Sequence, residues 1–213
     1  MSIAQRASAS ATTWLGRWSP ILPILVAEFV VWLGFGALLP ILPLYFRDHG
    51  VEFTTLGVII AAWPAARLIG EPIFGWVADR TRRVPLMVAG SALAGVFVFL
   101  PLLVAGAVPF IIFRALAGFS TAMYDPAARG TITDLTPSDR RGEAFGLYSA
   151  SQMGGLLFGP AIGGLGTALF GDVAFVFVFG GISSILAAIL VGFLVRETAG
   201  PARAHATASY DAA

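Results

Sequence analysis

Long apolar stretches alternate with short polar segments along nearly the whole chain. Each apolar stretch has about the 20 residues that a helix needs to cross a bilayer core roughly 30 Å thick. The pattern therefore predicts an all-α membrane protein with six transmembrane helices. We expect these helices at residues 21–45, 55–78, 84–104, 109–128, 144–170 and 173–195, joined by polar segments at 46–54, 79–83, 105–108, 129–143 and 171–172.

This pattern divides the chain into three parts. Residues 1–19 form a polar tail, residues 20–195 a six-helix transmembrane bundle, and residues 196–213 a second polar tail that we expect to be disordered. Apart from Arg47, the arginines outside the apolar stretches fall in segments that lie on one side of the membrane. Because basic residues gather on the cytoplasmic side of membrane proteins, both termini are expected in the cytoplasm and the bundle in the cell (inner) membrane.

Composition excludes several other classes of protein. Hydrophobic residues make up 57% of the chain, charged residues 12%, and the mean hydropathy is +0.84. A soluble domain carries about 25% charged residues, so this chain is expected to have a lipid bilayer around it. Without cysteine there is no disulfide or thiol chemistry, and the net charge of +1 gives no reason to expect nucleic acid. The two histidines lie in a loop and a tail, so no metal site and no cofactor are expected.

A short internal repeat links the second and fifth apolar stretches. The sequences LIGEPIFG (68–75) and LLFGPAIG (156–163) carry leucine, proline and glycine at the same offsets. These stretches are the middle helices of two successive helix triplets. Transporters are often built from such triplets in inverted orientation, so the repeat favours a 3+3 inverted-repeat bundle.

Charged residues inside the apolar stretches are the candidate functional groups. Glu28, Arg67, Glu71 and Arg114 each cost about 2.5–3.5 kcal/mol at a helix centre on insertion scales, so they should face a wet cavity or one another. Arg67 and Glu71 are four residues apart on one helix and are expected to pair. Glu28 and Glu71 could share a cavity, and a buried carboxyl can exchange a proton for a cationic substrate. Asp125, at the end of the fourth stretch, is expected to cap the helix or to pair with loop arginines.

Four spaced motifs give the bundle a family resemblance. The first is LGFGALLPILP, with Leu33, Gly34, Pro40 and Pro43; the second is Gly75, Asp79, Arg80 and Arg83; the third is Arg114 with Gly118; the fourth is Gly155, Gly159, Pro160, Gly163 and Gly164. In this order and on these helices, they resemble the N-terminal half of a major facilitator superfamily transporter of the twelve-helix drug:proton antiporter group. Arg82 and Val84 depart from that family's loop pattern, which has a glycine and a basic residue there.

The resemblance implies roles for these motifs. It assigns Arg114 to proton coupling, the Asp79 loop to a cytoplasmic gate, and the glycine motif to packing against a second six-helix bundle. The glycines recur at four-residue steps and form a smooth helix face that another helix can approach closely. The alternative to a second bundle is ordinary packing of this face within the same six-helix bundle. Pro160 removes a backbone donor and is expected to bend its helix.

The resulting functional hypothesis is a half-length, proton-coupled secondary transporter. It is expected to export small lipophilic or cationic compounds by alternating access, with Glu28 as the first candidate for the proton-carrying group. Its partners would be protons, a small-molecule substrate and a second six-helix bundle, either another copy or a separate C-terminal half. The alternatives are an inert N-terminal fragment of a split or truncated transporter, a half-transporter for metabolite or sugar uptake, and a six-helix membrane enzyme. The enzyme is disfavoured because the chain has no Gly-x-Ser-x-Gly and no His-Glu-x-x-His motif.

Overall fold

The computed structural model describes Trp14 and residues 16–198. In this part of the chain the secondary structure is helical. The elements are α2 (Leu22–Leu38), α3 (Leu42–Asp48), α4 (Phe53–Arg80), α5 (Arg83–Phe99), η1 (Leu100–Leu103), α6 (Ala107–Leu135), η2 (Ser138–Arg140), α7 (Arg141–Phe170) and α8 (Ala174–Leu194). The two tails predicted from the sequence lie largely outside the described residues.

The predicted membrane helices are confirmed in number and type within the described part of the chain. Five helices, α4 to α8, are each long and apolar enough to span a membrane, and α2 and α3 together make a sixth span. That first span is bent by 44° between its two halves, where the sequence predicted one helix. Pro40 and Pro43 explain the break, since neither can donate a backbone hydrogen bond to the preceding turn.

One predicted loop is much shorter than expected. Residues 129–143 were predicted to connect the fourth and fifth spans, but α6 continues to Leu135 and α7 begins at Arg141. Arg129 therefore lies on a helix. The polar residues of this segment indicated a loop. Residues 129–135 instead continue α6 beyond its apolar part.

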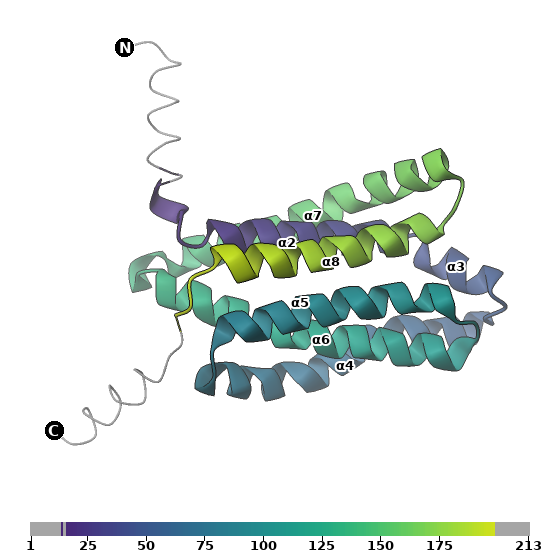
Figure 1. Cartoon of the computed structure of the whole chain (residues 1–213), viewed down its shortest axis with the longest axis horizontal. Helices are drawn as coiled ribbons and strands as arrows, with labels where there is room; N and C mark the ends of the chain where they lie inside the picture. Colours follow the sequence, from purple (N-terminus) through teal and green to yellow (C-terminus); the bar gives the residue numbers. More distant parts are fainter. Residues whose placement is uncertain (1–13, 15, 199–213) are drawn as a thin grey trace, which may run out of the picture.

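The helices pair in a pattern with an internal two-fold relation (Figure 1). α2 packs against α7 as α6 packs against α4, and α2 packs against α8 as α6 packs against α5. α5 and α8 pack against each other. Exchanging the triplet α2, α4, α5 with the triplet α6, α7, α8 leaves this pairing unchanged. The structure thus has the 3+3 organisation that the short sequence repeat predicted.

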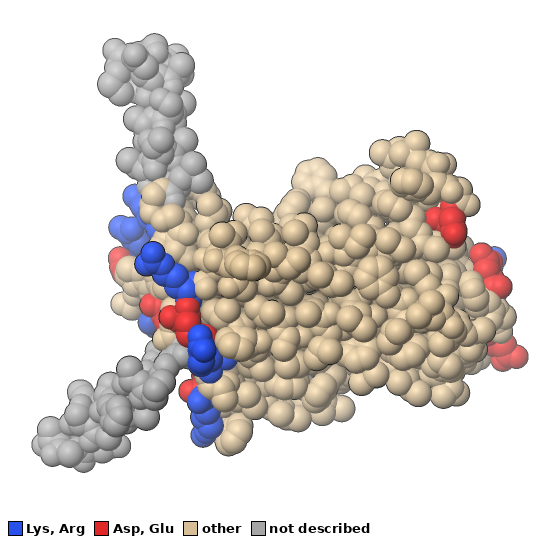
Figure 2. All heavy atoms as spheres, in the orientation of Figure 1, with Lys and Arg blue, Asp and Glu red and all other residues tan. Residues whose placement is uncertain are grey.

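Charged residues gather at the two ends of the bundle. Figure 2 shows acidic and basic side chains at either end of the visible face, with an uncharged band between them. One end holds the connections after α4, α6 and α8, and we call it the arginine-rich end. The opposite end holds the connections after α3 and α7. The uncharged band fits the hydrocarbon core of a bilayer, where an exposed charge is costly.

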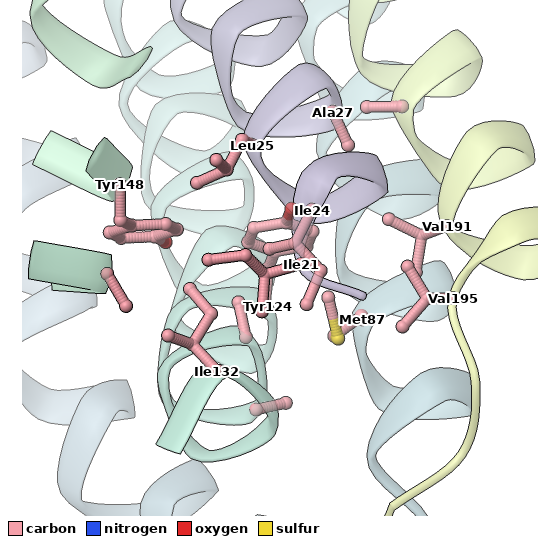
Figure 3. Packing of buried hydrophobic residues seen from close by; sticks show 14 of the residues in the cluster. Ile21, Ile24, Leu25, Ala27, Met87, Tyr124, Ile132, Tyr148, Val191 and Val195 are labelled. Carbon is pink, nitrogen blue, oxygen red and sulfur yellow. The ribbon is translucent and has the colours of Figure 1, made fainter. Parts of the chain in front are cut away.

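Two separate hydrophobic clusters close the bundle near its ends. The cluster at the arginine-rich end includes Ile21 and Ile24 of α2, Met87 of α5, and Tyr124 of α6, and Figure 3 shows these side chains converging between the helices. The cluster at the opposite end is richer in aromatic rings, including Tyr45, Phe46, Phe110 and Phe177. The middle of the bundle lies between these clusters and contains the cavity described below.

The glycine motif of α7 packs within this bundle, against α2. A Cβ added at Gly159 would lie 2.6 Å from the carbonyl oxygen of Leu33, and one added at Gly163 would lie 2.6 Å from that of Ala37. The expectation that this face meets a second bundle is therefore wrong for Gly155, Gly159 and Gly163. Pro160, on the exposed side, does not interrupt α7.

Gly159→Ala is expected to lower the free energy of unfolding by about 1–3 kcal/mol, because the added methyl group would collide with the backbone of α2. Gly164→Ala is the matched control on the same helix, since nothing lies within 4 Å of a Cβ added there. That change should be neutral or slightly stabilising, because alanine favours helix more than glycine does. Unfolding in detergent micelles measures both, and equal effects would contradict this packing.

Candidate functional site

A cavity with a mostly apolar wall and several charged or polar side chains lies in the middle of the bundle, between the two hydrophobic clusters. It is about 50 Å³ in volume, which is room for a few water molecules. All helices of the bundle except α3 and α7 contribute to its wall. Its lining includes Glu28, Trp32 and Phe35 of α2, Trp63 and Arg67 of α4, Ser91 of α5, Arg114, Tyr124 and Asp125 of α6, and Ser184 of α8.

Glu28 is the most enclosed acid of the cavity, with 1% of its surface exposed. Its Oε1 accepts hydrogen bonds from Trp32 Nε1 at 2.8 Å and from Gln152 Nε2 at 2.6 Å. Its Oε2 has no hydrogen-bond partner in the described part of the chain. The carboxyl is therefore held in place through one oxygen by two neutral donors, while the other oxygen is free to take up a proton.

Two tyrosine hydroxyls lie near this carboxyl. Tyr124 of α6 and Tyr148 of α7 are both buried and interact electrostatically with Glu28. The Tyr148 hydroxyl donates a 3.0 Å hydrogen bond to Asp125 Oδ1. The Tyr124 hydroxyl has no hydrogen-bond partner among the described residues. Of the two hydroxyl groups near Glu28, that of Tyr148 is hydrogen-bonded to Asp125 and that of Tyr124 has no hydrogen-bond partner among the described residues.

Arg67 of α4 binds two carboxyl groups and interacts electrostatically with a third. Its Nε lies 2.6 Å from Glu71 Oε1, which confirms the predicted pair four residues apart. A terminal nitrogen of the same guanidinium pairs with Asp125 Oδ2 on α6. Arg67 is also the cation that interacts electrostatically with Glu28. A residue that the sequence suggested to be structural is therefore at the centre of the site.

The structure corrects part of what was expected of two acidic residues. Arg129, which the sequence placed in the loop 129–143, lies 3.9 Å from Asp125 Oδ2, so the expected pairing of Asp125 with an arginine of that segment is confirmed. Asp125 was expected near the membrane surface, but it is buried within α6 and also binds Arg67 and Tyr148. The extension of α6 to Leu135 explains this, because Asp125 then lies more than two turns from the helix end. Glu71 does not line the cavity with Glu28. Its side chain is 37% exposed and is turned to Arg67.

Arg114 lies on the cavity wall with only 6% of its surface exposed. No acidic side chain of the described residues lies within ion-pair distance of it, and its buried Nε lacks a hydrogen-bond partner. Arg67 and Arg83, by contrast, each bind two carboxylates. Arg67 and Arg114 both line the cavity with Glu28, and Arg67 is the one of the two that has carboxylate partners.

The loop motif after α4 forms a charge cluster at the arginine-rich end. The buried Arg83 guanidinium lies 2.6 Å from Asp134 of α6 and 3.9 Å from Asp79. The Asp79 side chain is 72% exposed. Arg80 is exposed and covers the ring of Trp76, 4.2 Å from its centroid. Gly75 faces Pro126 of α6: a Cβ added at Gly75 would lie 3.9 Å from the Cβ of Pro126, an ordinary contact distance. The cluster thus joins α4, α5 and α6 within this one bundle.

The first-helix motif serves close packing. A Cβ added at Gly34 would lie 2.8 Å from the Cβ of Ser183 on α8. Leu33 supplies the carbonyl oxygen that Gly159 approaches, and Pro40 and Pro43 flank the bend between α2 and α3. This motif therefore allows α2 to pack closely between α7 and α8.

The aromatic wall of the cavity could not be predicted from the sequence. Phe35 stacks on Trp63 with ring centroids 4.8 Å apart, and it meets Trp32 edge to face at 5.4 Å. Tryptophan and phenylalanine are common in membrane helices, so neither their type nor their spacing marked them. Trp32 did carry a signal: it follows Glu28 by four residues, the spacing at which side chains on a helix meet.

Comparisons with known proteins agree with this architecture. A model of the Major Facilitator Superfamily matches residues 24–209. The chain is 30% identical over 169 residues to the quinolone resistance protein NorA of Staphylococcus aureus, which covers 79% of this chain and 43% of NorA. It is 28% identical over 182 residues to multidrug resistance protein 2 of Bacillus subtilis, covering 85% of this chain and 45% of that protein.

A solved structure shows the same fold. A bacterial homologue of the human lysosomal transporter Spinster, in an inward-facing and unoccupied conformation, aligns with a TM-score of 0.71 and 22% sequence identity. The alignment covers 86% of this chain and 44% of the other. The chain therefore spans somewhat less than half the length of the relatives that it matches. From the matching family model and these relatives, the chain belongs to the Major Facilitator Superfamily.

Proposed function

We propose that this chain forms one bundle of a proton-coupled transporter that exports small lipophilic compounds. The observation that carries the proposal is Glu28, a carboxyl buried in the wall of a cavity at the middle of a membrane bundle. Ionisable groups at such depth are costly and mark ion and substrate pathways. The names of the two relatives, a quinolone resistance protein and a multidrug resistance protein, support export of drug-like compounds.

In the proposed mechanism, Glu28 exchanges a proton while the cavity opens alternately to the two sides. Uptake of a proton at Oε2 leaves both hydrogen bonds at Oε1 in place and changes the charge opposite Arg67. Arg67 is bound to α6 through Asp125. A change in the charge of Glu28 therefore alters the electrostatic interactions of Arg67 and, through its ion pair with Asp125, the contact between α4 and α6. Protonation can thereby shift the population of two conformations. Glu71 is assigned a supporting role, as the second carboxylate that holds Arg67.

A second six-helix bundle is the proposed partner. α4 and α7 are the helices that each pair strongly with one neighbour, and both carry exposed apolar residues, including Leu68, Ile69, Leu157 and Phe158. Some of this surface faces lipid, and the remainder can meet another bundle. Two bundles related by an axis along the membrane normal are a known transporter architecture. The partner is either another copy of this chain or a separate bundle.

Within this proposal the charge cluster of Arg83 stabilises the arginine-rich end by joining α4, α5 and α6. We place this end in the cytoplasm. Its exposed members, Asp79 and Arg80, are available to contact the second bundle, whereas Arg83 and Asp134 stay within this one. The arrangement gives the loop motif a double role, in which an internal ion pair fixes the loop and exposed charges serve as the gate.

Dye efflux from bacterial cells that express the chain tests export. A lipophilic fluorescent dye should accumulate less in expressing cells than in cells with an empty vector, and a protonophore should abolish the difference. Equal accumulation in the two strains, with the chain and its partner bundle both present in the membrane, would contradict the proposal. An efflux that survives the protonophore would remove proton coupling.

Native mass spectrometry of the assembly in nanodiscs tests the partner. We expect a mass that accommodates two six-helix bundles, which is at least about twice the 22.3 kDa of this chain. A complex of two copies would identify self-assembly, and a complex with a different chain would identify a separate bundle. A single copy alone would contradict the proposed partner.

A further inference from the structure

We propose that the Tyr148 hydroxyl is a hydrogen-bond switch that responds to the charge of Glu28. In the structure it donates to Asp125 of α6, the arrangement expected for a neutral Glu28, and it turns to Glu28 of α2 when that carboxyl loses its proton. Tyr148 is thus a positioning residue and carries no proton itself, since its hydroxyl keeps its hydrogen in both arrangements. The inference rests on the proposed function for the proton exchange at Glu28 and adds the group that responds to it.

The close packing of α7 on α2 brings Tyr148 to Glu28. A Cβ added at Gly155 of α7 would lie only 2.5 Å from the carbonyl oxygen of Phe29, so the two helices touch through their backbones here. Just before this contact, Gln152 donates its 2.6 Å hydrogen bond to Glu28. Tyr148 precedes Gln152 by four residues and therefore lies on the same face of α7, one turn away. Its buried hydroxyl interacts with the Glu28 carboxyl.

The two carboxyl groups beside this hydroxyl differ in how well their charge is already compensated. Asp125 pairs through Oδ2 with Arg67, and Arg129 lies 3.9 Å from the same oxygen. It therefore keeps positive partners when Tyr148 leaves Oδ1. Glu28 accepts hydrogen bonds from neutral donors at Oε1 and from none of the described residues at Oε2. Because a buried charge without a partner is costly, the ionised form of Glu28 gains more from the hydroxyl than Asp125 loses.

The switch connects the charge of Glu28 to the contact between helices. A hydroxyl donates one hydrogen bond, so the contacts of Tyr148 with Asp125 and with Glu28 exclude each other. α7 packs closely on α2, and α6, which carries Asp125, packs closely on α4. The bond to Asp125 joins these two helix pairs, whereas a bond to Glu28 stays within one of them. Loss of the proton from Glu28 therefore releases α6 from α7 beside the cavity.

Other groups around the switch come from α4 and α6. The charged and titratable side chains that face Glu28 or Tyr148 from these helices are Arg67, Arg114, Tyr124, Asp125 and Arg129. The cavity-lining residues of α5 and α8 carry no charge. The arginines stay charged, so the competing donor is Tyr124, whose buried hydroxyl has no hydrogen-bond partner among the described residues. Figure 3 shows both tyrosines among the side chains that converge between the helices.

Infrared difference spectroscopy of the protein in nanodiscs, with isotope-labelled tyrosine, tests the switch. The C–O stretching band of a tyrosine shifts when its hydroxyl changes acceptor, and the label separates tyrosine bands from all others. We expect a tyrosine band that shifts over the same pH range in which the carboxyl band of Glu28 disappears. The chain has four tyrosines, so variants assign the band. The shift should be absent from Tyr148→Phe and from Glu28→Gln.

Two further tyrosine variants serve as controls. Tyr45→Phe removes a hydroxyl that is bound to the Pro101 carbonyl at the opposite end of the bundle, and Tyr124→Phe removes the competing donor. Both should keep the shift. No tyrosine shift in wild type while Glu28 titrates, a shift that persists in Glu28→Gln, or a shift lost with Tyr124 instead of Tyr148 would each overturn the proposal. Glu28→Gln retains Tyr148, so it decides the question even if Tyr148→Phe fails to fold.

Efflux measurements separate this inference from the proposed export. Tyr148→Phe should lower proton-driven dye efflux about 10-fold, the effect of losing one hydrogen bond to a charged group, and efflux equal to wild type would overturn the proposal. A tyrosine shift that depends on Glu28, without proton-driven efflux in wild type, would support the switch and contradict the transporter. Proton-driven efflux that requires Glu28, without a tyrosine shift, would support the transporter and overturn the switch.

Discussion

Asp125→Asn is expected to lower the free energy of unfolding by about 2–4 kcal/mol. The residue is buried and binds Arg67 of α4, and it accepts a hydrogen bond that the Tyr148 hydroxyl of α7 donates. Removing one partner of a buried ion pair typically costs about 3–5 kcal/mol, because the other charge stays buried without compensation. Glu71 remains beside Arg67 and should reduce the loss. Unfolding of the chain in mixed micelles measures the effect.

Asp79→Asn is the matched control for this variant. The Asp79 side chain is 72% exposed and lies 3.9 Å from Arg83, so its replacement should cost about 0–1 kcal/mol. A double-mutant cycle of Asp125→Asn with Arg67→Gln isolates the direct pair. Equal destabilisation by the two asparagine variants, or a coupling energy of zero in the cycle, would show that Asp125 does not hold α4 and α6 together.

Glu28→Gln is expected to abolish proton-driven transport by the active assembly. Glutamine has nearly the same shape and can still accept hydrogen bonds from Trp32 and Gln152 through its amide oxygen. It cannot carry an exchangeable proton. Stability should therefore change little while coupling to the proton gradient is lost, and transport in the direction of a substrate gradient can remain.

Glu143→Gln provides the control, since Glu143 is an exposed glutamate of α7. Its proton-driven dye efflux should equal that of wild type. Efflux from cells with Glu28→Gln that still responds to the proton gradient would remove Glu28 from the mechanism. Infrared difference spectra of the two variants after a pH change add a direct readout, because the carboxyl band lost with Glu28 would report its protonation.

The fold was largely predictable because membrane helices can be recognised in a sequence by the length and low polarity of their segments. A bilayer requires about 20 apolar residues for each span, and this requirement is visible in the sequence. The bend after α2 was less predictable, although Pro40 and Pro43 carried the signal. The end of α6 could not be placed by hydropathy, because residues 129–135 are polar and yet helical.

The site was predictable in its residue types and only partly in its contacts. Glu28 and Arg114 stood out as charges within apolar stretches, and both line the cavity. Asp125 was missed as a buried residue, since the apolar stretch was judged to end just after it. Arg67 of α4 pairs with Asp125 of α6, and no spacing within one helix can reveal a pairing between helices that lie far apart in the sequence.

The glycine motif shows a related limit. Glycines at four-residue steps predict a close helix contact, and α2 approaches α7 there as the pattern indicates. The identity of the approaching helix depends on the tertiary arrangement, and the resemblance assigned it to a second bundle. Within the described residues it is the neighbour that carries Leu33 and Ala37.

Proton movement driven by substrate tests the central claim most directly. Everted membrane vesicles that contain the complete assembly would be acidified inside and loaded with a pH-sensitive dye, and a lipophilic drug would then be added outside. Export coupled through Glu28 predicts that the drug enters the vesicles as protons leave, so the internal pH rises in wild type and stays constant in Glu28→Gln. A pH response that is equal in the two proteins, or absent from wild type while the drug still accumulates, would contradict proton exchange at this carboxyl.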